Sequence, residues 1–376
     1  MQLQLRRDTL KKVPVKDLHL LGGLAGATLA NALIHAPRLE VHIFESAAEF
    51  SERGAAVGLG INAQLALNEI MSAPAAVALL DKAGGVPTNT SRIGSGPEAG
   101  SLIFDLAEGD PGRTLHRASL LRELLAPLPN DLLHANRQLV TIKTNNKGVE
   151  LSFQDDNHVL GDQAAVYAAS PAGFWDCRNL VPFDKAKTVG EGAFLMHDPL
   201  ESRTVVQCVV SAIERDPGTN PKDRKRSLSR GLLEESLHSW LDGPIAKGII
   251  DRTPTYAKQR VCLIGDAAHA TTPWQGAGVG LAMEDAMVLG ALLAKVSSKE
   301  DFEYAFQAYD TVRRPRCQPI IDSSRETGYI LCGQSGLRAD ELRGLLAPQW
   351  NFLFGLDMSG HKRDALDKMR ELQEKA

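Results

Sequence analysis

Two glycine-rich turns, each between a predicted strand and a predicted helix, contain the residues best suited to chemistry. In the first turn, Gly23 and Gly26 fit the second and third glycines of a dinucleotide-binding fingerprint, and Gly22 takes the first position if the turn is one residue shorter. Such glycines let backbone N–H groups and a helix N-terminus approach a pyrophosphate. Glu45 ends the following strand, where a carboxylate can accept hydrogen bonds from ribose hydroxyls. The first turn predicts an adenine-dinucleotide site, although a tight α/β turn without a ligand has the same pattern.

The second turn lies in residues 260–286, which read RVCLIGDAAHATTPWQGAGVGLAMEDA. A buried strand ends in Gly-Asp, and a glycine-rich turn then leads into a long helix that begins near Gly278. This segment resembles the second FAD motif of group A flavoprotein hydroxylases, the family of salicylate and para-hydroxybenzoate hydroxylases. The resemblance implies that the Asp266 carboxylate binds the ribityl hydroxyls and that the backbone at Gly278 and Val279 lies near the flavin ring. A helix N-terminus there favours negative charge on the flavin.

Further stretches match the same family in chain order. They are Glu45, Gly58 within RGAAVGLGIN and Arg117 within LHRASLL. In relatives the residue matching Arg117 contacts the FAD pyrophosphate, and a guanidinium suits this role because it pairs with phosphate through two hydrogen bonds. The alternative for Arg117 is an ordinary surface arginine at a helix start. The resemblance also implies that Pro273 shapes the loop facing substrate and flavin, and that Trp274 forms a wall of the substrate pocket.

The family pattern breaks in the middle of the chain. Relatives carry a motif of the type D-G-x-x-S-x-x-R that helps hold FAD and the nicotinamide cofactor, and residues 149–180 contain no such string. Two further contractions lie near residues 195–200, where Asp198 stands in place of an active-site tyrosine, and near residues 247–251. Arg178 in CRNLVP matches an arginine that helps hold the substrate phenolate, so it is the candidate catalytic residue. The losses fit an incorrectly spliced gene model, a decayed paralogue or a chain adapted to another task.

Composition places the chain among ordinary globular proteins. It has 376 residues, 43% of them hydrophobic, and a net charge of -4 that gives no reason to expect a nucleic-acid partner. The basic run at residues 221–230 is interpreted as a solvated loop. The five cysteines are widely separated, so neither a disulfide framework nor a metal site is expected. We find no stretch with the length and apolar character of a membrane span or signal peptide, and we expect a cytoplasmic protein.

The expected fold class is α/β, with a Rossmann-like FAD-binding domain, an inserted mixed β-sheet substrate domain and a C-terminal helical region. Residues 1–150 are expected to form the N-terminal part of the FAD-binding domain. Residues 151–255 are expected to form the contracted substrate-binding β-sheet region. Residues 256–376 are expected to contain the second FAD motif and the C-terminal helices.

Periodicity predicts further elements between the motifs. Residues 63–80 read as one helix despite Pro74, and residues 117–128 as another, with Ser119 available as its cap. Residues that favour β-structure predict three strands in a second, substrate-facing layer, at residues 149–153, 166–169 and 205–210.

The resemblance implies a FAD-dependent monooxygenase. Such an enzyme uses NAD(P)H and dioxygen to hydroxylate a phenolic or aromatic-acid substrate through a flavin C4a-hydroperoxide. The expected partners are therefore a small aromatic substrate and dioxygen, without nucleic acid or membrane, and a homodimer is left open. Two alternatives are an inactive or repurposed flavoprotein remnant of the family and a NAD-dependent dehydrogenase. The dehydrogenase is disfavoured because a single Rossmann unit does not explain the GDAAHA segment.

Overall fold

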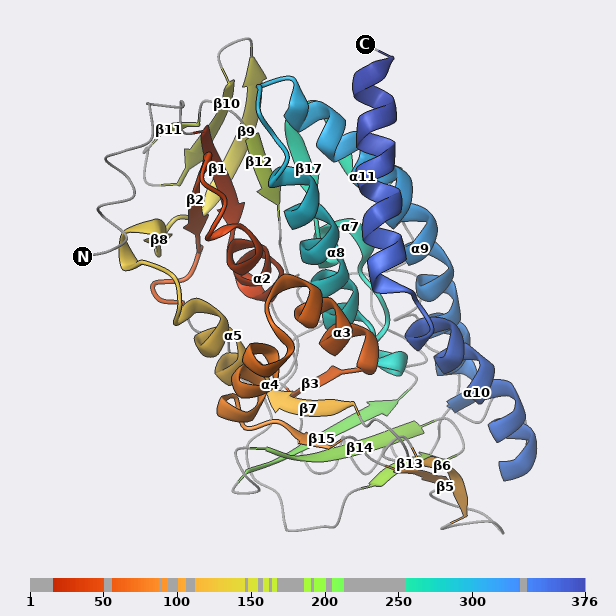
Figure 1. Cartoon of the computed structure of the whole chain (residues 1–376). Coiled ribbons are helices and arrows are strands. Elements are labelled where there is room, and N and C mark those ends of the chain that lie inside the picture. Colours follow the sequence, from red (N-terminus) through yellow and green to blue (C-terminus); the bar gives the residue numbers. More distant parts are fainter. Residues whose placement is uncertain are drawn as a thin grey trace, which may run out of the picture.

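A largely parallel sheet at the centre of the computed structural model positions both glycine-rich turns (Figure 1). Its strand order is β16-β17-β12-β1-β2-β8, and every neighbouring pair is parallel except β16 with β17. Because β1 and β17 run in the same direction, the turns that follow them lie at the same edge of the sheet. The strands are β1 (Lys16–Leu21), β2 (Leu39–Phe44), β8 (Leu133–His134), β12 (Ala164–Tyr167), β16 (Ala257–Lys258) and β17 (Val261–Leu263).

The structure describes only part of the chain. Arg178, the basic run at 221–230 and the contraction near 247–251 lie outside the described residues. Those described are 16–50, 56–87, 90–93, 101–105, 112–145, 148–154, 158–161, 164–167, 186–190, 193–200, 205–212, 254–331 and 337–375.

Two helices, α2 (Gly23–Leu33) and α8 (Gly278–Leu293), pack together against one face of the central sheet. Leu18 and Leu20 alternate along β1 and are fully buried in the same core cluster as these helices. The two helices approach closely because small residues meet: a Cβ added to Gly290 would lie 2.6 Å from the Cβ of Ala32. This contact fixes the first turn relative to the helix that follows the second turn.

A three-stranded antiparallel sheet covers part of the other face. Phe44 of the central sheet packs there against Val149, Leu151 and Phe153. The strand predicted at residues 149–153 therefore exists, but its expected place in the substrate-facing layer is wrong. An alternating apolar face shows that a strand is half buried and does not show which sheet it covers. The strands are β9 (Leu139–Asn145), β10 (Gly148–Phe153) and β11 (His158–Gly161).

A five-stranded sheet of order β15-β14-β13-β5-β6 lies beyond the helices (Figure 1). It contains β15, the strand predicted at 205–210, whereas the strand predicted at 166–169 is β12 of the central sheet, which is a second correction. This sheet combines strands from two of the expected ranges: β5 and β6 come from residues 1–150, and β13, β14 and β15 come from residues 151–255. The strands are β5 (Thr90–Ile93), β6 (Leu102–Asp105), β13 (Ala186–Gly190), β14 (Ala193–Leu200) and β15 (Val205–Ala212).

The helical prediction for residues 63–80 is wrong at one point. The segment forms two helices, α3 (Ile61–Ile70) and α4 (Ala73–Lys82), because Met71 and Ser72 are extended and Pro74 lies in the first turn of α4. Helix α5 (Arg117–Leu125) forms as predicted, but Ser119 lies buried within its first turn and His116 is the N-cap, so Ser119 is not the cap. A small sheet of order β3-β7-β4 leads into α5, formed by β3 (Ala56–Leu59), β7 (Arg113–His116) and β4 (Val86–Pro87).

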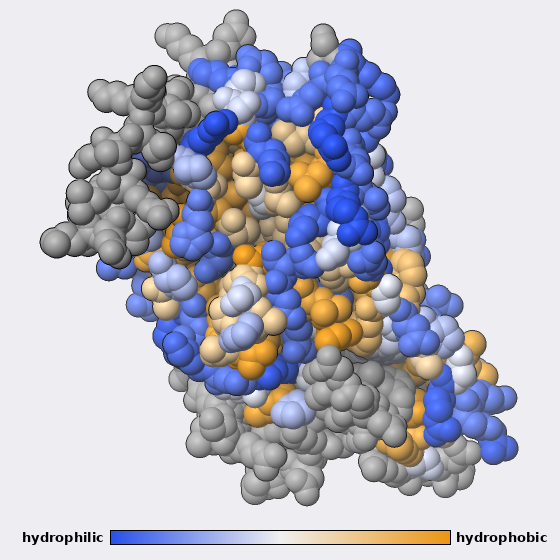
Figure 2. Space-filling view, in the orientation of Figure 1, coloured by the Kyte–Doolittle hydropathy of each residue, from blue (hydrophilic) through white to orange (hydrophobic). Residues whose placement is uncertain are grey.

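The C-terminal part of the described chain is helical, as predicted. Helix α11 is amphipathic: Met358, Ala365 and Met369 are buried, and Figure 2 shows hydrophilic residues over its outer face. Among the described residues, no helix is both long enough and apolar enough to span a membrane. The remaining helices are α7 (Asp266–His269), η5 (Pro273–Gln275), α9 (Asp301–Leu331), α10 (Ala339–Phe354) and α11 (Met358–Glu374).

Charged side chains are buried where α8 meets α9. Arg313 places Nη1 2.7 Å from Glu284 Oε2 and Nε 2.9 Å from Asp285 Oδ1, while Arg316 Nη2 lies 3.3 Å from Glu284 Oε1. Burial alone would raise the pKa of Glu284, but Arg313 and Arg316 hold it below its ordinary value. Removing one member of such a network leaves an uncompensated buried charge, at a cost of about 3–5 kcal/mol.

Three histidines meet where the central sheet is covered by the three-stranded sheet. His19 on β1 is only 3% exposed, and it pairs in register with His42 on β2. The Nδ1 atom of His42 lies 3.0 Å from His134 Nε2. Burial, with added repulsion from His42 and His134, lowers the pKa of His19 from 6.5 to about 4. A proton on His19 would therefore be held in a poorly hydrated site.

We expect His19 to make the protein less stable in mild acid. Its folded pKa lies below its ordinary value, so its contribution is fully present above pH 6.5 and is lost as the pH falls towards about 4. The loss should reach about 3 kcal/mol. Urea unfolding at several pH values should therefore show a weaker pH dependence in His19→Leu than in the unchanged protein. His35→Leu, which alters an exposed histidine, is the control; the same slope in both variants would contradict the prediction.

Candidate flavin site

The first glycine-rich turn lies directly against the acid that follows β2. Gly22 donates its N–H to the Phe44 carbonyl at 2.7 Å, and a Cβ on Gly22 would collide with the Glu45 carboxylate. Gly23 begins α2 with φ +83°, a conformation that favours glycine, and Gly26 is buried one turn later. Gly22 therefore lies tightly against the end of β2, and its place as the first glycine of a shortened fingerprint stays a prediction.

Hydrogen bonds hold both the backbone and the side chain of Glu45. Its N–H donates to the His134 carbonyl at 2.8 Å, and its own carbonyl accepts from the Arg137 N–H at 2.7 Å. One carboxylate oxygen, Oε1, accepts hydrogen bonds from the Ser46 hydroxyl at 3.0 Å and the Ala47 N–H at 2.9 Å. The other oxygen faces Gly22, so the acid lies at the mouth of the turn, where a ribose would follow a pyrophosphate.

The second turn packs on the helix of the first. Gly265 has φ +59°, and a Cβ there would lie 3.1 Å from the Cβ of Ala25 in α2. Asp266 begins α7, and a Cβ on Gly278, the first residue of α8, would lie 3.7 Å from Asp266 Oδ1. Val279 follows, half buried, in the first turn of α8. Two motifs far apart in the sequence thus form one continuous wall.

Arg117 lies close enough to Asp266 for their charges to interact. Burial lowers the pKa of Arg117, and the Asp266 carboxylate favours its charged form. Arg117 begins α5 immediately after β7, and β7 pairs with β3, so Gly58 lies opposite Thr114 on the same small sheet. A Cβ on Gly58 would have no atom within 4 Å. The Arg117 guanidinium therefore reaches the Asp266 carboxylate of the second turn from the end of the small sheet.

The two predicted substrate-pocket residues lie on the loop between α7 and α8. Pro273 is exposed at the start of η5. The Trp274 indole is half buried against α9, so close to Gly328 that a Cβ there would collide with it, and it joins a cluster that includes Trp350. This packing accounts for the orientation of Trp274, while the pocket role of both residues stays a prediction. Arg178, the predicted catalytic residue, is outside the described residues.

Asp285 was not predicted from the sequence, yet it holds the second turn. Its Oδ2 accepts the Gly265 N–H at 2.8 Å and lies 2.6 Å from His269 Nε2. Burial alone would raise the pKa of Asp285, but His269 and Arg313 hold it well below its ordinary value. The available signal was a pair of adjacent acids inside the otherwise apolar helix 278–293, because buried acids require partners.

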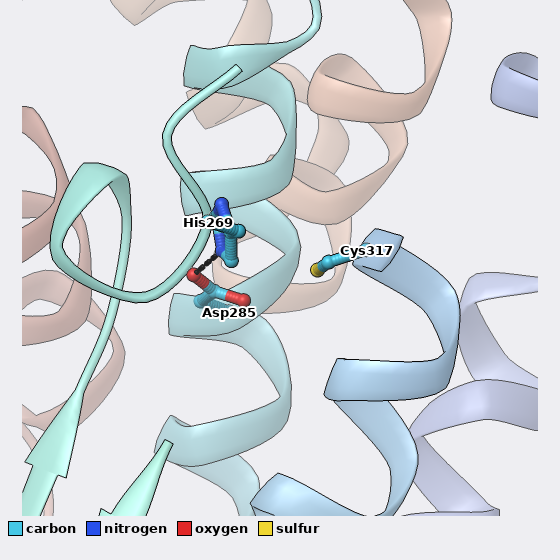
Figure 3. A group of neighbouring side chains, drawn as sticks. All are labelled: His269, Asp285 and Cys317. Atoms are coloured by element: carbon cyan, nitrogen blue, oxygen red, sulfur yellow. Dashed lines mark hydrogen bonds and ion pairs between the residues drawn. The ribbon is translucent and has the colours of Figure 1, made fainter. Parts of the chain in front are cut away.

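His269, Asp285 and Cys317 form a fully buried group (Figure 3). Burial alone would lower the pKa of His269, but the Asp285 carboxylate raises it well above its ordinary value, so the pair is ionic. Both Asp285 oxygens already accept hydrogen bonds, and the Arg313 guanidinium adjoins one of them. A divalent cation would have to be placed beside that guanidinium, so these residues suit an ion pair better than a metal centre.

These residues suit FAD on structural grounds. The N-terminus of α2 and the Arg117 guanidinium provide positive charge for a pyrophosphate, and Glu45 and Asp266 provide acceptors for the hydroxyls on either side of it. At Gly58 and at Gly276, which has φ +63°, an added side chain would extend into open space. Because both residues are glycines, the backbone at these two positions stays uncovered. An α/β fold of the Rossmann type with this donor set fits a flavin dinucleotide.

Comparison with known proteins agrees with this class. A family model described as "FAD binding domain" matches residues 171–324. The 6-methylsalicylate 1-monooxygenase atA of Aspergillus terreus is 28% identical, with 94% of this chain and 92% of that protein covered. The FAD-dependent monooxygenase orf3 of Aspergillus niger is 27% identical, with 82% and 85% covered. The resemblance to FAD-dependent aromatic monooxygenases is thereby confirmed, and FAD is the cofactor of the matched family model.

Solved structures share the fold. A salicylate hydroxylase substrate complex superimposes with a TM-score of 0.73 at 23% identity, covering 94% of this chain and 98% of that chain. FqzB gives a TM-score of 0.75 at 15% identity, covering 97% and 96%. The predicted α/β class is confirmed. The alignment with the A. terreus protein runs over 416 residues, more than the 376 of this chain, so this chain has gaps relative to it.

Substituting Gly22 should weaken FAD binding. Gly22→Ala forces the Glu45 carboxylate away from the turn, and the new Cβ also lies 3.3 Å from the Phe44 carbonyl oxygen. We expect the dissociation constant of FAD, measured by quenching of flavin fluorescence, to rise about tenfold or more. Gly344→Ala is the matched control, because Gly344 lies exposed in α10 with no atom within 4 Å of an added Cβ. Unchanged affinity in Gly22→Ala would show that the turn does not face the cofactor.

Proposed function

We propose that this protein is a FAD-dependent monooxygenase that hydroxylates a phenolic or aromatic-acid substrate with NAD(P)H and dioxygen. The observation that carries the proposal is the meeting of the two motifs: Gly265 packs on Ala25 of α2, and Asp266 interacts with Arg117. A dehydrogenase needs only the first turn, whereas an extended flavin cofactor needs both. The named activities of the relatives, which include 6-methylsalicylate 1-monooxygenase, support an aromatic acid as the substrate class.

The described residues would divide the binding of FAD among them. Arg117 and the α2 N-terminus would hold the pyrophosphate, Glu45 the adenosine ribose, and Asp266 the ribityl hydroxyls. The chemistry supplied by the cofactor is oxidation of NAD(P)H and activation of dioxygen. The amides of Gly278 and Val279, at the N-terminus of α8, would face the flavin ring and favour negative charge on it.

On the substrate side, the proposed residues are Pro273, Trp274 and Arg178. Pro273 is exposed on the loop and would exclude water from the ring, while Trp274 would support that loop from behind through its packing on Gly328. Arg178 would pair with the phenolate or carboxylate of the substrate, as its resemblance to relatives suggests. We further propose that the protein acts in the cytoplasm.

One observation favours a second candidate, a flavoprotein remnant that binds FAD without hydroxylating. Strand β12 lies between β1 and β17 in the central sheet, so its carboxyl end lies between the first turn, which follows β1, and the second turn, which follows β17. Relatives place their D-G-x-x-S-x-x-R motif after the equivalent strand, and the sequence after Tyr167 lacks it. In relatives that motif helps hold the nicotinamide cofactor as well as FAD, so its loss would weaken NAD(P)H binding even where Arg117 and Asp266 still held FAD.

The two candidates differ in one assay. Purified protein should show the visible absorption of bound flavin, and a hydroxylase should oxidise NAD(P)H faster when salicylate or a related phenolic acid is added. Hydroxylated product should form in proportion to the NAD(P)H consumed. A flavin-containing protein whose NAD(P)H oxidation does not respond to any of these acids would support the remnant instead.

Asp266→Ala should abolish retention of FAD during purification, because the variant loses the acceptor for the ribityl hydroxyls and the charge partner of Arg117. The ratio of flavin to protein absorbance measures the effect. Glu326→Ala, which removes an exposed acid from α9, should leave that ratio unchanged. An Asp266→Ala protein that still purified with a full complement of flavin would refute the role given to this residue.

A further inference from the structure

The segment that connects the Gly265 turn to the start of α8 is anchored on α9 at both ends. At the first end, Arg313 donates from Nε to Asp285 Oδ1 at 2.9 Å and from Nη2 to the Leu281 carbonyl at 3.1 Å. Asp285 uses its other oxygen to accept the Gly265 N–H at 2.8 Å. Arg313 therefore fixes the carboxylate that fixes the turn immediately before Asp266.

At the second end, a separate set of hydrogen bonds joins the loop to α9. The Thr272 and Ser324 hydroxyls lie 2.7 Å apart, and the Ser324 hydroxyl is 2.8 Å from the Thr272 carbonyl oxygen. Gln275 donates from Nε2 to the Ser323 hydroxyl at 2.8 Å and lies within 3.2 Å of the Thr327 hydroxyl. All but Ser323 are buried, so water competes poorly for these bonds.

The two anchor points are separated by a fixed length of one helix. Arg313 and Thr327 both lie on α9, roughly four helical turns apart, or about 20 Å along its axis. Between the corresponding loop positions, Gly265 and Gln275, the chain forms only the single turn of α7 and the short η5. Neither element has enough internal hydrogen bonds to hold its shape alone.

We infer that α9 is the template for the flavin-facing loop, with Arg313 and Thr327 acting as positioning residues for Asp266 and for the start of α8. The inference rests on the proposed binding of FAD to this loop. Neither residue touches the cofactor in this arrangement. Each acts through a side chain of the loop or of α8: Arg313 through Asp285, and Thr327 through Gln275.

The electrostatics of the first anchor are consistent with this role. Burial alone would lower the pKa of Arg313, but Glu284 and Asp285 are among the groups that raise it well above its ordinary value. The Gly265 N–H therefore donates to an ionised carboxylate, and such charge-assisted bonds are stronger and more directional than neutral ones. A displaced Asp285 would leave the buried Gly265 N–H without its acceptor.

The matched substitutions are Arg313→Lys and Arg316→Lys. Both arginines lie on α9 and pair with Glu284, but only Arg313 reaches Asp285. A lysine keeps the charge and cannot bridge both acids in the planar geometry of a guanidinium. We expect the dissociation constant of FAD to rise about tenfold or more in Arg313→Lys and less than about twofold in Arg316→Lys.

A second pair tests the other anchor with less risk to folding. Thr327→Val removes a hydroxyl that accepts from Gln275 and donates to Gln349, while Thr311→Val removes a hydroxyl that donates to the Gln307 carbonyl on the same helix. Valine matches threonine in shape, so both proteins should fold. We expect Thr327→Val, and not Thr311→Val, to raise the FAD dissociation constant several-fold.

Amide hydrogen exchange of the apoprotein provides a readout that does not depend on the cofactor. Exchange should become faster in residues 262–277 in Arg313→Lys and Thr327→Val, and stay unchanged there in the two controls. A merely structural role would speed exchange throughout α8 and α9 in all four variants. Equal changes within each matched pair, in affinity or in exchange of this segment, would overturn the inference.

These results are separable from a failure of the proposed activity. If the unchanged protein binds FAD but hydroxylates nothing, the FAD affinities of the variants still test whether α9 is the template for the loop. If it binds no FAD, the cofactor proposal fails, and faster exchange confined to residues 262–277 in Arg313→Lys and Thr327→Val would still support the template.

Discussion

The structure depends on a buried carboxylate that cannot exist without its partners. Asp285 lies inside α8 with no exposed surface, and an ionised acid in that environment is tolerated only when it is paired and hydrogen-bonded. Its partners come from three places in the chain: Arg313 from α9, His269 from α7 and the Gly265 backbone from the second turn. Satisfying one charge therefore fixes the relative positions of a helix pair and of a cofactor-facing turn.

Small residues make the other half of this arrangement possible. Ala32 and Gly290 allow α2 and α8 to approach, and Ala25 and Gly265 allow the two motifs to touch. Larger side chains at these positions would separate the first turn from the second. The apolar core and the candidate flavin site are thus set by the same contacts, and hydrogen bonds such as that from the Gly265 N–H to Asp285 complete what the packing begins.

Local sequence patterns predicted the strands and helices whose formation depends on neighbouring residues. The strand that leads to Glu45 follows from its partly alternating apolar residues, and the helix beginning at Gly278 follows from the glycine-rich turn before it; both are confirmed. The sheet to which β10 and β12 belong could not be predicted, because an apolar alternation does not identify the surface it will cover. The break at Met71 was missed because the helical spacing continues on both sides of it. Arg313 was missed because its role depends on an acid 28 positions earlier that only tertiary packing brings close.

The length of chain between the two ends of the site has a consequence for synthesis in the cell. The first turn, at Gly22, emerges from the ribosome early, and the second turn emerges much later, at Gly265. The anchors on α9 follow it, at Arg313 and Thr327. A growing chain would therefore carry an exposed, incomplete nucleotide-binding half for most of its synthesis, at rates of about 5–20 residues per second. Capture of flavin would then be among the last events of folding, and a chain that ended before α9 would present both motifs without the frame that joins them.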